Sequence, residues 1–187
     1  MNDKLEALVR EADVKSFEGR LNRLEFLLEN LGEGYAPFPA IVLQYFEETK
    51  LCFYQGAFVA SILMVSATFE ELLRQIYRDA NEMEKARAKG LSDLVENAID
   101  DNLISPEEAE EITNLRKLRN KFTHINIGFG EGSIKNKQTF LDYMLLWGDP
   151  REEKLPIEEF SKGAIKVFTR LLPELCNRFW ETNNIRT

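Results

Sequence analysis

Apolar residues recur at three- and four-residue spacing along most of the chain, which is the period of an amphipathic helix. Residues 3–31 predict one or two such helices that end before Gly32. The leucines that form their predicted apolar stripe are Leu21, Leu24, Leu27, Leu28 and Leu31. After the linker "GEGYAPFP", with Pro39 placed to open a helix, the helical pattern resumes from Ala40 to about Asp79, with a bend expected near Gly56. The part "GAFVASILMVSATFEELL" is apolar around most of its circumference and predicts the most buried helix.

Further helices are expected in the second half of the chain. A short one is predicted around residues 91–99. In "SPEEAEE", Ser105 is suited to cap a helix, Pro106 to its first position, and Glu108 to the reciprocal position of a capping box. This pattern predicts a helix over about 106–125.

The segment after His124 has a different character. "INIGFGEGSIKNKQ" has three glycines and no helical period, so it predicts a loop or a short hairpin, and "TFLDYMLLWG" predicts a short helix. The last helix is expected from about Pro156 to Trp180, with a possible kink at Pro173. Its predicted apolar stripe comprises Phe160, Ile165, Phe168, Leu172, Leu175 and Phe179.

These elements predict an all-α fold, because no segment alternates convincingly as a strand would. We expect an antiparallel helical bundle of five to seven helices, in which the helices at 40–79 and 106–125 pack side by side at the centre. A chain of 187 residues fits one domain. Its expected parts are an N-terminal helical extension (1–34), a core (40–126), a loop and short-helix insertion (127–155) and a C-terminal helix (156–182).

Composition narrows the class of protein. Apolar residues make up 44% of the chain and charged residues 30%, which is typical of soluble globular proteins. The charged N-terminal stretch lacks the apolar segment of a secretion signal, and the longest apolar run is too short to cross a bilayer. We therefore expect a cytoplasmic protein without a membrane partner. Cys52 and Cys176 lie in apolar surroundings far apart in sequence, which favours reduced thiols over a disulfide.

Charge is distributed unevenly along the chain. The net charge of −8 argues against a protein that coats nucleic acid through a broad basic surface. Residues 91–111 contain eight acidic residues and no basic one, whereas residues 113–124 contain four basic residues, Arg116, Lys117, Arg119 and Lys121, and no acidic one. A local basic patch on an acidic protein fits a small anionic site.

This basic stretch, "NLRKLRNKFTHIN", includes His124, the single histidine of the chain. On a helix its apolar residues, Leu115, Leu118, Phe122 and Ile125, fall within an arc of roughly 80°, and Arg119, Asn120 and His124 fall in a separate polar arc of roughly 140°. Such an arc can flank a phosphate, but it is also what the solvent-facing side of any amphipathic helix looks like.

The segment "LRKLRNKFTH" resembles the R-x4-H signature, often written R-N-x-x-x-H, of the HEPN superfamily of helical domains. Arg119, Asn120 and His124 match that signature residue by residue. The helix "ASILMVSATFEELLR" is similar to the A-x-x-x-x-A-x-x-E-x-L-L helix that precedes the motif in many bacterial members, and Glu70 matches its glutamate. The resemblance covers roughly residues 40–126, although the aromatic that some members carry two residues after the histidine is Asn126 here.

The resemblance implies a metal-independent endoribonuclease that works as a homodimer, with no cofactor, often as a toxin or phage-defence effector. In that reading His124 transfers a proton during attack by the ribose 2′-hydroxyl, Arg119 stabilises the phosphorane, and Asn120 orients His124 or the phosphate by hydrogen bonding. Arg116, Lys117, Lys121 and Thr123 would bind the RNA. Because each chain has one histidine, two motifs would have to face each other to supply both an acid and a base.

The resemblance also leaves questions open. Many HEPN domains are non-catalytic modules that bind RNA, a nucleotide or a protein partner, and a cognate antitoxin or defence complex would be an additional partner. Glu70 can pair with Arg119 or lie on a solvated helix edge, since Glu71 follows it. In a dimer we expect an anion in the cleft, or acids such as Glu70, Glu108 and Glu111, to relieve repulsion among the basic residues.

Other chemistries lack the residues they need. One histidine and two separated cysteines do not make a zinc site of the usual kind, and Lys121 stands where a di-iron bundle would need a glutamate before His124. Neither a phosphate-binding P-loop motif nor a nucleophile elbow is present. The phenylalanines fall mostly on apolar stripes, so we interpret them as core residues rather than base-stacking platforms.

Overall fold

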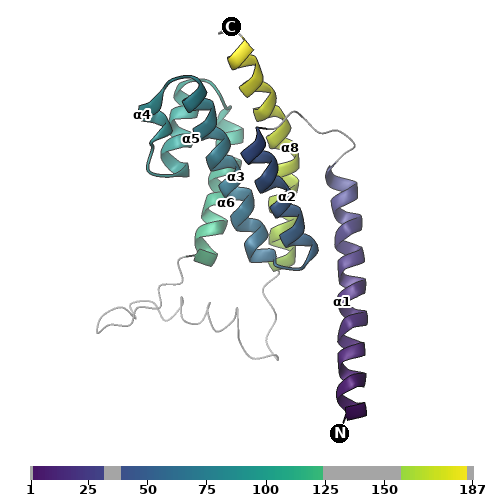
Figure 1. The fold of residues 1–187 in the computed structure, drawn as a ribbon. Coiled ribbons are helices and arrows are strands. Elements are labelled where there is room, and N and C mark those ends of the chain that lie inside the picture. Colours follow the sequence, from purple (N-terminus) through teal and green to yellow (C-terminus); the bar gives the residue numbers. More distant parts are fainter. Residues whose placement is uncertain (1, 32–38, 124–156, 185–187) are drawn as a thin grey trace, which may run out of the picture.

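The computed structural model describes residues 2–31, 39–123 and 157–184, which form an all-helical bundle (Figure 1). Its seven helices in this part of the chain are α1 (Asn2–Leu31), α2 (Ala40–Tyr54), α3 (Phe58–Asp79), α4 (Met83–Ala86), α5 (Leu91–Asp100), α6 (Pro106–Thr123) and α8 (Ile157–Asn184). The expected all-α class and the number of five to seven helices are confirmed for these residues. The loop or hairpin and the short helix predicted at 127–155 lie outside the described residues.

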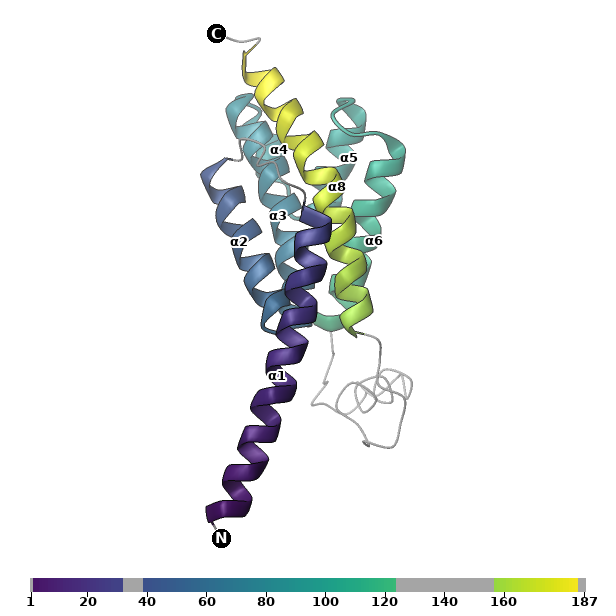
Figure 2. The ribbon, with the colours of Figure 1, turned by 90° about the vertical axis from the view of Figure 1, so that its right-hand side faces the viewer.

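Helix α3 forms the centre of the bundle and packs against α2, α6 and α8, with the short α4 and α5 at one end (Figures 1 and 2). Its apolar circumference explains this position, since Ile62, Val65 and Phe69 are fully buried. Phe168 from α8 meets Phe69 edge to face at 5.7 Å between ring centroids, and stacks on Phe46 from α2 at 5.6 Å. The predicted pairing of the buried helix with α6 at the centre is therefore confirmed.

The chain breaks into two helices at Gly56, where the sequence predicted one helix with a bend. Gly56 has φ +79°, and the Ala57 amide donates to the Cys52 carbonyl at 2.8 Å, as at the end of a helix that closes through a left-handed residue. Glycine adopts this conformation without the steric penalty of a side chain. The reversal lets α2 fold back on α3 as a hairpin (Figure 1).

The start of α6 has the predicted capping box. The Glu108 amide donates to Ser105 Oγ at 3.2 Å, and the Ser105 amide donates to Glu108 Oε2 at 2.6 Å. Pro106 is the first helical residue, as expected. Two amide groups at the helix start are thereby satisfied locally, which places this helix end independently of its neighbours.

Helix α8 continues through Pro173 and buries most of its predicted stripe. Phe160 is the exception at 37% exposure, because it lies near the start of the helix beside α6. Ser161 is fully buried and its hydroxyl lies 2.6 Å from the Ser61 hydroxyl of α3. This contact pairs two buried polar groups that would otherwise destabilise the core.

Helix α1 is a single helix that ends at Leu31, as the following Gly32 predicted. Only its C-terminal half packs on the bundle, against α2 and α8, while the N-terminal half projects beyond it (Figures 1 and 2). Leu27 is buried with Phe53 of α2, and Arg23 Nε donates to the Tyr54 carbonyl at 2.8 Å. The sequence grouped the leucines of α1 into one buried stripe, and this was wrong for Leu21, Leu24 and Leu28, which are exposed.

The described residues bear on two expectations from the sequence, which concern membrane spans and the state of the cysteines. No helix among them is long and apolar enough to cross a membrane. Cys52 is half-buried and Cys176 is buried, and both are free thiols, as expected. Burial raises the pKa of Cys176 to about 12, so this thiol stays protonated at neutral pH.

Candidate functional site

The basic stretch occupies the last two turns of α6, where Arg116, Arg119 and Asn120 of the predicted polar arc are half-buried. Arg116 and Arg119 each follow, by one turn, a buried residue of the same helix, Ile112 and Leu115. Both arginines are half-buried. The two arginines thus border the core-facing side of α6, on which Leu118 and Phe122 still pack against the core.

Arg119 lies between α6 and α3, where three long contacts surround its guanidinium group. Nη1 is 3.5 Å from Glu70 Oε2 on α3, and Nε and Nη2 are each 3.4 Å from Asn120 Oδ1. The sequence left open whether Glu70 pairs with Arg119, and the structure brings the two together. These distances exceed the usual 2.7–3.2 Å of an N–H···O hydrogen bond. The guanidinium has five N–H donors, so its hydrogen-bonding capacity is only loosely used by the described neighbours.

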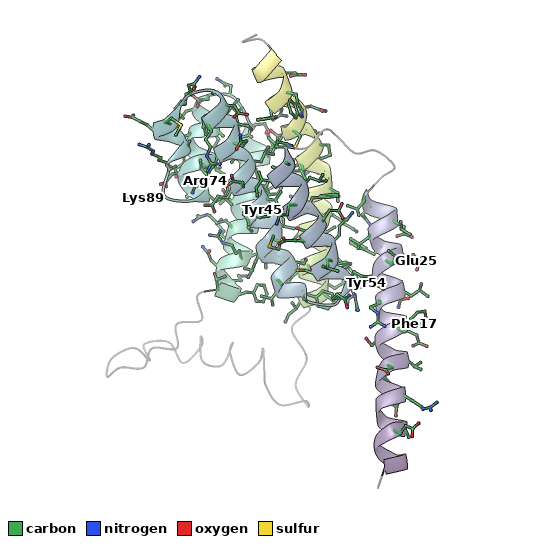
Figure 3. The ribbon with its side chains drawn as sticks, viewed as in Figure 1. Phe17, Glu25, Tyr45, Tyr54, Arg74 and Lys89 are labelled. Carbon is green, nitrogen blue, oxygen red and sulfur yellow. The ribbon has the colours of Figure 1, made fainter. Side chains whose placement is uncertain are left out.

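Glu70 is held in place by Arg74, a residue that the sequence analysis did not select. Arg74 Nη2 donates to Glu70 Oε1 at 2.8 Å, and Arg74 Nη1 donates at 2.9 Å to the carbonyls of Ala86 and Ala88. Arg74 lies beside the α4–α5 end of the bundle, as Figure 3 shows. The i,i+4 spacing of Glu70 and Arg74 could have indicated the pair, but the contacts to residues 86 and 88 depend on the tertiary fold.

Arg116 has a different environment. Its Nε atom is buried and makes no hydrogen bond to any residue that the structure describes. A buried donor without a partner carries a desolvation penalty, which an anion or a bound water would relieve.

Three other predicted site residues of α6 lie at the protein surface. Lys117, Lys121 and Thr123 are exposed, and the Thr123 hydroxyl donates to the Arg119 carbonyl at 3.2 Å. His124, the predicted proton-transfer group, lies outside the described residues. Four cationic residues therefore lie within the last two turns of α6, where the helix dipole favours positive charge, although Lys117 and Lys121 lie on the opposite side of the helix from Arg119.

Of the three acids expected to offset this charge, only Glu70 approaches it. Glu108 instead binds Arg178 of α8 through two 2.8 Å contacts, and Glu111 pairs with Arg170 of α8. Burial alone would raise the pKa of Glu108, but Arg178 and the hydrogen bonds from Ser105 outweigh it and lower the pKa. Within one chain Glu108 and Glu111 thus connect α6 to α8, and the expectation that they offset basic charge in a dimer stays a prediction.

Two further features bear on what the site can hold. No group of His, Cys, Asp and Glu among the residues with described positions is arranged to bind a metal ion. An open, mainly apolar groove of about 360 Å³ lies between α6 and α8, lined by residues such as Leu115, Leu118 and Val167. The lining does not include Arg116, Arg119 or Glu70, so the groove is separate from the cationic cluster.

The arrangement suits a small anionic group better than a long polyanion. Arg116 and Arg119 offer half-buried donors, and Lys117 and Lys121 add exposed charge within two turns of one helix. We refer to Arg116, Arg119, Asn120 and Glu70 as the α6 cluster. Comparison with known proteins adds nothing to this description, since no family model, curated protein or solved structure matches the chain.

Proposed function

We propose that the protein is a metal-independent endoribonuclease of HEPN type that cleaves RNA by attack of the ribose 2′-hydroxyl on the adjacent phosphate. The observation that carries the proposal is the loosely bound guanidinium of Arg119 in the α6 cluster. It is half-buried, its described partners lie at 3.4 to 3.5 Å, and it comes five residues before the single histidine. An anion could replace these long contacts with shorter ones at little cost.

The proposed chemistry assigns one task to each residue of the motif. An imidazole has an unperturbed pKa of about 6.5, so His124 can accept or donate a proton near neutral pH. Arg119 supplies a planar, permanently charged donor to the phosphorane oxygens as negative charge develops on them. Asn120 orients Arg119 through the contact at its Oδ1. Lys117, Lys121 and Thr123 bind the flanking phosphates.

Glu70 acts in this scheme as a positioning residue. Arg74 holds one of its carboxylate oxygens at 2.8 Å, and the other oxygen faces Arg119. A fixed acid at this point keeps the Arg119 guanidinium from extending into solvent before substrate binds. Because the pair is long and partly solvated, its attraction is modest, and a phosphate that carries more charge can compete for the guanidinium.

A homodimer completes the proposed site. In-line cleavage uses one group to deprotonate the 2′-hydroxyl and another to protonate the leaving oxygen, and two copies of His124 would supply both. Two α6 clusters facing each other would concentrate positive charge, which an RNA phosphate between them would neutralise. A toxin or defence effector, controlled by an antitoxin or a larger complex, is the role that fits such an enzyme.

The experiment is a cleavage assay with labelled RNA in the presence of EDTA. Arg119→Ala and His124→Ala are expected to reduce the cleavage rate by roughly 100-fold or more, the usual effect of removing a transition-state donor or a proton-transfer group. Lys15→Ala is the matched control, because Lys15 is an exposed cationic residue on α1 and not part of the α6 cluster. Glu70→Gln is expected to act mainly on kcat, because it disturbs the orientation of Arg119. Its effect on KM for RNA should be smaller, because it removes no cationic side chain.

Cleavage that persists in both the Arg119 and His124 variants would refute the proposal. If no RNA is cleaved but RNA binding depends on Arg116 and Arg119, the alternative of a non-catalytic binding module replaces it. A specific feature supports that alternative: the buried Arg116 Nε could donate a hydrogen bond to a bound anion, and this requires no catalysed reaction.

A further inference from the structure

Helix α1 carries a row of large apolar side chains on the side that faces away from the bundle. Phe17 and Glu25 mark this side in Figure 3. The row, called here the α1 stripe, comprises Val14, Phe17, Leu21, Leu24 and Leu28, which are between 41% and 71% exposed. The bundle side of α1 is occupied by other residues, with Leu27 buried and Phe26 partly buried against Phe53. One helix therefore has two apolar sides, and only one of them is covered by the described residues.

The spacing within the α1 stripe is specific. Its members follow one another at intervals of three, four, three and four residues, which is the alternation of the a and d positions of a coiled coil. Val14, Leu21 and Leu28 take the a positions, and Phe17 and Leu24 take the d positions. A helix with this pattern is complementary to a second helix of the same kind, because each side chain fits a gap between four residues of the partner.

We propose that two copies of this chain associate by pairing their α1 helices in parallel along the α1 stripe. A half-exposed large apolar side chain presents roughly 100 Å² of surface, so the ten side chains of two copies would remove roughly 1,000 Å² from water. This area reaches the lower end of the range for specific interfaces, before any contribution from flanking residues. Because the α1 stripe is exposed and the bundle packs on the other side of α1, a second copy can reach the stripe.

The flanking charges favour a second copy over a lipid surface. Glu18 and Glu25 are exposed on one edge of the stripe, whereas helices that lie on anionic membranes carry lysine and arginine there. In a parallel pair Arg20 comes beside Glu25 of the second copy, and symmetry forms this attractive contact twice. One heptad earlier Asp13 comes beside Glu18, which is repulsive and limits the affinity.

The α1 stripe is distinct from the α6 cluster. Helix α1 packs on α2 and α8, whereas the α6 cluster lies between α6 and α3. The pairing of α1 helices therefore does not rest on the proposed ribonuclease function. It would bring two chains together even if the α6 clusters formed no common site.

The test is sedimentation velocity of the full chain at micromolar concentration. The unchanged chain is expected to be a dimer, and Leu21→Glu combined with Leu28→Glu is expected to raise its dissociation constant roughly 100-fold or more, because each carboxylate would be buried without a partner. Leu51→Glu is the matched control, since Leu51 is a similarly exposed leucine on α2. Circular dichroism should show the same helix content in all three proteins.

Two further variants test the parallel orientation. Leu24→Cys in a Cys52→Ser background is expected to cross-link to its own copy under mild oxidation, because d positions meet each other in a parallel pair. Asp13→Lys is expected to lower the dissociation constant several-fold, because it replaces the repulsion with Glu18 by an attraction. A monomeric chain, a dimer that the two glutamates leave intact, or the absence of a cross-link at position 24 would each overturn the proposal. If the unchanged chain is a dimer of this kind but cleaves no RNA, the proposed ribonuclease function is refuted and the α1 pairing is not.

Discussion

Replacing Glu108 is expected to destabilise the protein, because its side chain joins α6 to α8. The carboxylate is 9% exposed and accepts two hydrogen bonds from Arg178 at 2.8 Å, as well as one from the Ser105 amide at 2.6 Å. Glu108→Ala removes all three contacts, while Arg178 keeps its hydrogen bond to the Leu103 carbonyl at 2.9 Å and lies 3.9 Å from Glu174. Glu108→Gln keeps the size of the side chain and can still accept from Ser105.

The magnitude follows from these contacts. Losing half of a capping box costs about 1 kcal/mol. Breaking a fully buried ion pair costs about 3–5 kcal/mol, but the Arg178 side chain is 37% exposed and solvent screens the pair, so about 1–2 kcal/mol is appropriate here. Glu108→Ala should therefore lower the free energy of unfolding by about 2–3 kcal/mol, and Glu108→Gln by about 1–2 kcal/mol.

The effect should depend on pH with a definite sign. The pKa of Glu108 is lowered in the folded protein, because Arg178 and Ser105 outweigh its desolvation. A group whose pKa is lowered by folding stabilises the protein above its unfolded pKa and loses that contribution as pH falls through its folded pKa. The difference in unfolding free energy between the unchanged protein and Glu108→Gln should be complete at pH 7 and shrink below about pH 4.5.

Urea unfolding followed by circular dichroism at pH 7 and at pH 4 measures both quantities. A double-mutant cycle with Arg178→Met isolates the ion pair, with an expected coupling energy of about 1–2 kcal/mol. A loss below 0.5 kcal/mol for Glu108→Ala, or an equal loss at both pH values, would refute the reasoning, because the ion pair would then contribute nothing that depends on ionisation.

Three other predictions concern the bundle. Gly56→Ala should destabilise the protein by about 1–2 kcal/mol, because the backbone at this position has φ +79°. Gly163→Ala should stabilise it by about 0.5–1 kcal/mol, because Gly163 lies inside a helix and an added methyl group has no other atom within 4 Å. Thermal unfolding of the two variants checks these opposite signs. Ser161→Ala should cost about 1–3 kcal/mol by leaving the buried Ser61 hydroxyl unpaired, and adding Ser61→Ala should recover part of that loss in urea unfolding. Cys176, with its raised pKa of about 12, should react with a thiol reagent at pH 7.5 only on unfolding, so labelling at the same rate in native and unfolded protein would contradict its burial.

Local signals in the sequence predicted those elements whose cause is local. The Ser105–Glu108 box and Pro106 determine where α6 begins, because their hydrogen bonds join residues within one turn. The apolar circumference of "GAFVASILMVSATF" predicted the central helix, because a helix without a polar side can only be stable when it is surrounded. The sequence predicted a bend near Gly56. A glycine within a helical pattern is compatible with either a bend or a complete reversal of the chain, and the packing of α2 on α3 selects the reversal.

The environment of the α6 cluster could not be predicted from local sequence signals. A helical wheel placed Arg119 in a polar arc, and the structure half-buries Arg119 and Arg116 beside the core-facing residues Ile112 and Leu115. The partner Glu70 was named from sequence as one alternative, and Arg74 was not named at all. Their contacts join residues 49 and 4 positions apart along the chain, and the anchoring of Arg74 at Ala86 and Ala88 needs the loop after α4 in place.

The sequence by itself determined the helical class, the starts and ends of most helices, and the concentration of basic residues before His124, because periodicity, capping and composition act over a few residues. Only the tertiary structure decided which side of each helix is covered. Helix α1 has apolar residues around much of its circumference, and contact with Phe53 and Ile165 buries Leu27 while leaving the α1 stripe exposed. Burial depends on the positions of distant segments relative to one another, whereas the helical pattern describes one helix at a time and not its neighbours.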